Sequence, residues 1–223
     1  MKRTKLANRI LPDYTKGEEI MNMVTHIVGG SLGVVALILC ILKAALTGTY
    51  VDIIGASIYG ASIIILYTIS SVYHGLCPGI GKKVLQILDH CSIYLLIAGT
   101  YTPILLSAFL PKFPLIGWIL LIFQWALGAT AATLTAIDLK KYKALSMVCY
   151  IFMGWSVIFF SPQAYAALGH WGFILVLWGG IAYTIGAVLF AIGAKLRWFH
   201  CVFHLFVLLG SILHFLGIYL YVL

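Results

Sequence analysis

Long stretches of apolar residues follow one another along the chain, and short polar segments separate them. Each stretch holds about 20 residues, the length that a helix needs to cross the hydrocarbon core of a bilayer. The pattern therefore predicts an all-α membrane protein with seven transmembrane helices, at residues 24–44, 53–75, 87–110, 114–136, 145–163, 170–194 and 199–222. Because these spans use nearly the whole chain, we expect a short N-terminal tail at 1–23 and a single transmembrane domain at 24–223.

Composition supports this assignment. Of the 223 residues, 63% are hydrophobic and only 9% are charged, and the mean hydropathy of +1.08 lies far outside the range of soluble globular domains. The first apolar stretch lacks the small-residue cleavage site of a signal peptide, so we expect it to be retained as a helix.

The basic residues are divided unequally between the two sides of the predicted membrane. Lys43 and Lys112 fall on one side, and the remaining twelve share the other side: Lys2, Arg3, Lys5, Arg9, Lys16, Lys82, Lys83, Lys140, Lys141, Lys143, Lys195 and Arg197. The positive-inside rule then predicts a cytoplasmic N-terminus and an external C-terminus. The net charge of +8 is explained by topology and by contact with anionic lipid headgroups, so no nucleic-acid partner is expected.

Two histidines stand at the head of the last apolar stretch. His200 and His204 are four residues apart, so on a helix they share one face and lie about 6 Å apart along its axis. Such a pair commonly presents two imidazoles to one metal ion. Ionisable residues inside a membrane span are costly and indicate function. His214 lies about 15 Å deeper, too far to share that metal.

The predicted topology brings further polar residues to the same depth. His74 ends an inward-going span with Ser70 one turn deeper, and Asp89 begins the next span outward, where it needs a hydrogen-bonding or cationic partner. Three imidazoles with one open position are typical of catalytic zinc, whereas four protein ligands are typical of structural zinc. A fourth ligand from Asp89 or Cys77 would favour the structural alternative.

Other polar positions have simpler interpretations. Glu18 and Glu19 suit the first turn of a helix, where they face the positive end of its dipole. Asn22 and His26 share a helix face, and we expect them to support or gate the cytoplasmic mouth of the site. His170 falls at the external boundary, where solvent exposure explains it.

Backbone-determining residues also have predicted roles. Pro103 should kink the third span. Small residues should allow close packing of helices, notably at Gly29, Gly33, Gly179 and Gly186.

Together these motifs resemble the progestin and adipoQ receptor family, and specifically its bacterial hemolysin III branch. The resemblance covers almost the entire chain and rests on Ser70-x3-His74, Asp89, His200-x3-His204 with His214, the run at 99–103, and Glu19, Asn22, Thr25 and His26. It implies zinc near the cytoplasmic leaflet, held by His74, His200 and His204, with Asp89 and Ser70 beside the metal-bound water. We expect no counterpart of the long N-terminal cytoplasmic region of the receptors, which argues against receptor signalling.

The resemblance also ranks the possible functions. Because the superfamily includes alkaline ceramidases, we expect a zinc-dependent hydrolase of the cell membrane that cleaves a lipid amide or ester. One alternative is a receptor or sensor with structural zinc. Another is a cytolytic protein, although the nearly uniformly apolar spans do not favour a pore. A proton or ion pathway through Asp89 and the histidines is the weakest alternative.

Overall fold

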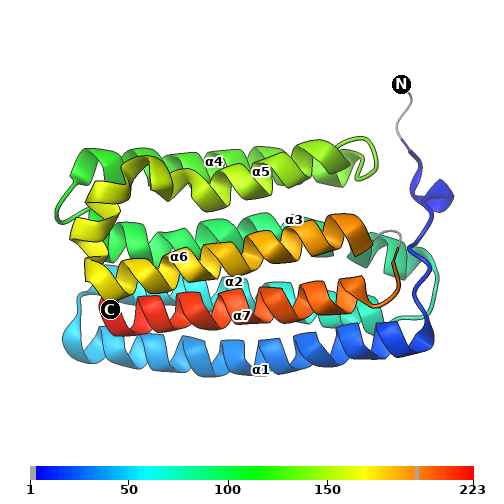
Figure 1. Ribbon diagram of the computed structural model, residues 1–223, viewed down its shortest axis with the longest axis horizontal. Coiled ribbons are helices and arrows are strands. Elements are labelled where there is room, and N and C mark those ends of the chain that lie inside the picture. Colours follow the sequence, from blue (N-terminus) through cyan, green and yellow to red (C-terminus); the bar gives the residue numbers. More distant parts are fainter. Residues whose placement is uncertain (1–3, 194–195) are drawn as a thin grey trace.

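The helices lie nearly parallel to one another along the long axis of the molecule (Figure 1). The computed structural model describes residues 4–193 and 196–223, so Lys2, Arg3, Lys195 and the end of the predicted sixth span lie outside the described residues. Those described residues form seven α-helices, α1 (Lys16–Thr47), α2 (Tyr50–Gly75), α3 (Ile80–Pro103), α4 (Pro114–Ile137), α5 (Lys143–Trp155), α6 (Ser161–Gly193) and α7 (Phe199–Tyr221). Short 3-10 helices lie at Leu6–Asn8 and Ser156–Phe160.

The order of helices in space places the two ends of the chain apart. α1 packs against α2 and α7, α3 packs between α2 and α4, and α6 packs against α7. α5 and α6 run in opposite directions and are joined by the short helix Ser156–Phe160 (Figure 1). The first described residues and the C-terminus lie at opposite ends of the bundle (Figure 1).

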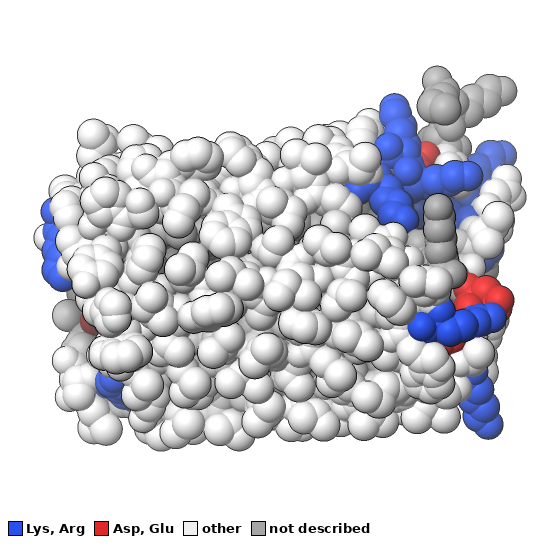
Figure 2. Space-filling view, viewed as in Figure 1, with Lys and Arg blue, Asp and Glu red and all other residues white. Residues whose placement is uncertain are grey.

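The described residues contain six helical segments that are long and apolar enough to cross a membrane. The segment Lys143–Gly193 counts as one of them, at 51 residues, although the hydropathy pattern divides it into spans at 145–163 and 170–194. Within it, Gly169 has a non-helical backbone with a φ of 69°. On the face seen in Figure 2, charged side chains gather at the two ends, mostly at the end near the N-terminal segment, and the surface between the ends is uncharged. The chain is therefore a multi-pass membrane protein.

Several helices begin before the apolar stretches that predicted them. α1 begins at Lys16 because Thr15 and Glu18 form a capping box, with each side chain bonded to the other residue's backbone N–H. The last third of the predicted tail at 1–23 is thus helical. α3 begins at Ile80, seven residues before the predicted span, and passes at Pro103 into a π-helix at Ile104–Phe109.

Close helix contacts depend on residues without a side chain. A Cβ atom on Gly99 would lie 2.3 Å from the Ser62 Oγ, so α2 and α3 approach at a distance that only glycine allows. Gly179 likewise lies against the ring of His214, where a Cβ would lie 2.1 Å from that ring. The predicted packing role of Gly179 is confirmed.

Candidate metal centre

Three histidines from two distant parts of the chain meet at one end of the bundle. His74 comes from the last turn of α2, and His200 and His204 come from the first turns of α7. One nitrogen of each ring lies within 4.8 Å of the other two, and all three residues are buried. The Nε2 atoms of His200 and His204 are 3.1 Å apart. The predicted convergence of these residues is confirmed.

The hydrogen bonds of these rings leave nitrogen lone pairs for a metal ion. The His74 Nδ1 lies 2.6 Å from the Glu19 carboxylate, and its Nε2 is buried without a partner. A neutral ring that donates its Nδ1–H to Glu19 has its lone pair on Nε2. Since an unpaired buried acceptor is costly, this orphaned atom fits a ligand of Zn²⁺.

His204 is oriented in a similar way. Its Nδ1 lies 3.5 Å from the Thr25 Oγ1, whose own hydrogen is within reach of the Met21 and Asn22 carbonyl oxygens, both at 2.9 Å. Thr25 therefore acts as the acceptor for a weak Nδ1–H bond, which leaves the His204 Nε2 lone pair directed toward His200. Hydrogen bonds of this kind fix the tautomer and orientation of metal-binding histidines.

A partly buried ion pair lies beside the Nδ1 atom of His74. The second oxygen of Glu19 lies 2.6 Å from the Lys82 Nζ, and Lys82, only 4% exposed, also donates to the Leu76 carbonyl at 2.9 Å. The interpretation of Glu19 as a helix-dipole residue and of Lys82 as a topology charge missed this pair. The spacing of Glu19, Asn22 and His26 on one helix face was the available signal.

The predicted supporting residues contact the histidine cluster directly. The Asn22 Nδ2 lies 3.5 Å from the His74 Nδ1. The ring of His26 stacks on His204 with centroids 3.7 Å apart, and both of its nitrogens are buried without a hydrogen-bond partner. Tyr14, from the segment before α1, stacks on His200 at 4.9 Å.

Asp89 and Ser70 lie beside the cluster without joining it. Both line one cavity together with His200 and His204, and the Ser70 hydroxyl is a hydrogen-bonding neighbour of the Asp89 carboxylate. Asp89 is enclosed by protein but retains accessible surface because it faces this cavity. Cys77 is exposed, and neither it nor Asp89 belongs to the close group of ligand atoms in the described chain. The catalytic roles of Asp89 and Ser70 stay predictions.

His214 and His170 stay outside the ligand group, as expected. His214 is bonded through its Nε2 to the Val176 carbonyl at 3.0 Å. His170 is exposed at the other end of the bundle.

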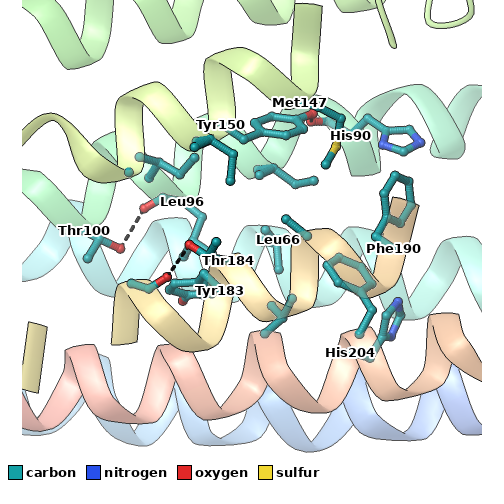
Figure 3. Close-up of a pocket in the computed structure, with 18 of the residues that line it drawn as sticks. Leu66, His90, Leu96, Thr100, Met147, Tyr150, Tyr183, Thr184, Phe190 and His204 are labelled. Carbon is teal, nitrogen blue, oxygen red and sulfur yellow. Dashed lines mark hydrogen bonds between the residues drawn. The ribbon is translucent and has the colours of Figure 1, made fainter. Parts of the chain in front are cut away.

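The cavity beside the metal centre is mainly apolar. Its volume is about 150 Å³, and its walls come from α2, α3, α5, α6 and α7, with His26 of α1. Figure 3 shows His204 and Phe190 toward one end, Thr100 toward the other, and Leu66, Leu96 and Tyr150 between them. A space of this character suits a hydrocarbon chain.

The chain has relatives of similar length that match it nearly from end to end. Residues 14–215 match the family described as Haemolysin-III related. Hemolysin-3 of Bacillus cereus is 40% identical over 206 residues, which cover 92% of each chain. The Hemolysin-3 homolog of Bacillus subtilis (strain 168) is 38% identical over 208 residues, which cover 93% of this chain and 96% of the relative. The chain is a multi-pass protein of the bacterial cell membrane, and it belongs to the haemolysin-III-related family, a branch of the progestin and adipoQ receptor family.

Proposed function

We propose that the protein is a zinc-dependent hydrolase that cleaves a lipid amide or ester. The observation that carries this proposal is the convergence of three buried imidazoles, of which His74 has an orphaned Nε2 and His200 and His204 line a largely apolar cavity that Asp89 also lines. Three nitrogen ligands with Asp89 and Cys77 outside the group match an open catalytic site better than a closed structural one.

The chemistry divides between the metal and the protein side chains. Zn²⁺ held by the three histidines would supply a water of pKa about 7 and polarise the substrate carbonyl. Asp89 accepts the proton of the attacking water and returns it to the leaving nitrogen or oxygen. Ser70, beside Asp89, orients that water through its hydroxyl. The apolar cavity holds the acyl chain and excludes bulk water.

We further propose seven membrane crossings with the histidine cluster at the cytoplasmic end. α5 and the part of α6 after Gly169 run in opposite directions (Figure 1), and the non-helical Gly169 between them supports a separate fifth and sixth crossing within the long helical segment. The basic residues gathered at the end near the N-terminal segment support a cytoplasmic N-terminus. Fusion of a periplasm-silent fluorescent protein to each terminus tests this: fluorescence from the C-terminal fusion and not the N-terminal one would contradict it.

The Asp89→Asn variant tests the hydrolase. We expect it to retain the zinc content of the wild type and to release fatty acid from lipid amides or esters about 10²- to 10⁴-fold more slowly, as for loss of a general base. Asp52→Asn is the matched control, because Asp52 caps α2 at the opposite end of the bundle. Zinc-loaded wild type that cleaves no lipid amide or ester, beside an active ceramidase in the same micelles, would refute the proposal.

The names of the relatives suggest a second candidate, lysis of membranes. We infer that any lysis by this chain follows from lipid cleavage, since many large apolar side chains are exposed on the surface of the bundle. Dye-loaded liposomes distinguish the two mechanisms: leakage should require zinc and Asp89, and prompt leakage without zinc would instead indicate a pore.

A further inference from the structure

A second cavity adjoins the metal centre at the N-terminal end of the bundle. Its volume is about 650 Å³, larger than that of the apolar cavity, and its lining is more polar. Segment 8–14, the connection between α4 and α5, and the end of α6 supply its walls. The two cavities share six residues at their boundary: Asp89, His90, Met147, Tyr150, Phe190 and His200. The predicted catalytic carboxylate therefore faces both.

The N-terminal segment that encloses this cavity is fastened at several points. The Thr4 N–H donates to the Asp138 carboxylate at 2.8 Å, and the Lys83 Nζ donates to the Ala7 carbonyl at 2.6 Å. Arg197 pairs with Asp13 at 3.3 Å. Since these bonds join the segment to three separate parts of the bundle, the cavity wall is a defined part of the fold.

The cations around this cavity are not all neutralised by carboxylates. Arg197 is paired with Asp13 and with Glu18, which also line the cavity. Three other cations in the lining form no ion pair with any described residue, namely Arg9, Lys140 and Lys143. The site thus retains positive charge after its internal pairs are made.

Arg9 is the residue that most specifically indicates a ligand. It is 8% exposed, and its buried Nη1 atom has no hydrogen-bond partner. A guanidinium buried without an acceptor is costly, and its planar donors match the oxygens of a phosphate. Lys143 reaches the same cavity from the start of α5 and lies over the ring of Phe190 at 5.8 Å.

We propose that the protein binds a lipid that carries a phosphate group, with the phosphate on Arg9, Lys140 and Lys143 and an acyl chain in the apolar cavity. The bond between these two parts then lies at the shared boundary, beside Asp89 and His200. Cleavage at this bond rests on the proposed function: water adds OH to the acyl carbon and H to the leaving atom, giving a fatty acid and a phosphate-bearing amine or alcohol.

Binding of two ether-linked lipids to the zinc-loaded protein tests the phosphate site without hydrolysis. The lipids share one alkyl chain, and one ends in a phosphate monoester and the other in a hydroxyl. We expect the wild type to bind the phosphate lipid about 10- to 100-fold more tightly, the range for hydrogen bonds to charged groups. Arg9→Gln and Lys143→Gln should each reduce this preference several-fold.

Matched variants separate a lost contact from a damaged fold. Lys141→Gln changes a cation of the same connection that does not line the cavity, so its preference should equal that of the wild type. Lys143 is exposed, so Lys143→Gln remains informative if Arg9→Gln fails to fold. An unchanged preference in Lys143→Gln and in any folded Arg9→Gln, or no preference in the wild type, would overturn the proposal.

Two further arms identify the source of the phosphate and separate this proposal from the hydrolase. Inorganic phosphate and glycerol phosphate should displace the phosphate lipid only at concentrations far above its Kd, and displacement near that Kd would overturn the role of the acyl chain. If the wild type prefers the phosphate lipid but does not cleave the corresponding acyl-linked lipid, the hydrolase proposal is refuted and the phosphate site is not. If the protein cleaves acyl-linked lipids that end in a phosphate and in a hydroxyl equally well, the phosphate site is refuted and the hydrolase is not.

Discussion

Replacing Glu19 by glutamine should weaken zinc binding without removing a ligand. The carboxylate lies 2.6 Å from both the His74 Nδ1 and the Lys82 Nζ, and an amide can accept from only one of them through its single oxygen. Loss of such a supporting contact typically weakens metal affinity about 10- to 100-fold, equivalent to about 1.4–2.7 kcal/mol. In this variant the buried Lys82 ammonium loses its carboxylate partner and is bonded mainly to backbone carbonyls. This loss should lower the free energy of unfolding by about 2 kcal/mol.

Competition with a chelator of known zinc affinity, in detergent, measures this effect. Glu18→Gln is the matched control, because the neighbouring carboxylate bonds to the backbone of Thr15 and Trp198, at 2.8 and 2.6 Å, and contacts none of the three histidines. It should lower thermal stability and leave zinc affinity unchanged. Zinc affinity of Glu19→Gln equal to that of the wild type would show that the carboxylate does not orient His74.

Two further changes test local parts of the account. Thr25→Val removes the acceptor facing the His204 Nδ1 and should weaken zinc affinity up to about 10-fold, whereas Thr25→Ser keeps the hydroxyl and should not; equal affinities in chelator competition would contradict this. Gly99→Ala places a Cβ 2.3 Å from the Ser62 Oγ and should cost about 1–3 kcal/mol, whereas Gly154→Ala meets no atom within 4 Å and should not destabilise; thermal unfolding that ranks the two variants the other way would refute the packing argument.

The convergence of the three histidines was predictable because membrane spans alternate in direction. Once His74 ends an inward-going helix and His200 and His204 begin an outward-going one, hydropathy alone places them at one depth. Close packing at Gly179 was predictable on a different ground, because small residues within apolar spans have few roles other than contact between helices.

The partners of the cluster were less accessible to sequence reasoning. Lys82 stands beside Lys83 in a short polar connection, a pattern typical of exposed topology charges, yet it is buried against Glu19 from 63 positions earlier. Pairing over such a distance depends on the helix packing. The cover formed by the N-terminal segment was missed for the same reason, because Thr4 and Asp138 are 134 positions apart.

The boundary between the fifth and sixth predicted spans was the weakest part of the fold prediction. Apolar residues continue through Ser156–Phe160, so hydropathy carries no sign of the change from α-helix to 3-10 helix there. The predicted start of the sixth span at residue 170 does coincide with the non-helical Gly169, where two helices meet within Ser161–Gly193. Polarity alone could not locate the end of α5, because that helix ends among apolar residues.

Metal analysis of the purified protein tests the central claim most directly. Elemental analysis of wild type prepared without chelator should find about one zinc per chain, as for a mononuclear site. The zinc should be lost in His74→Ala, His200→Ala and His204→Ala, and retained in Asp89→Ala and in the exposed control His170→Ala. Wild type without zinc, or equal loss in Asp89→Ala and the three histidine variants, would contradict an open three-histidine zinc site.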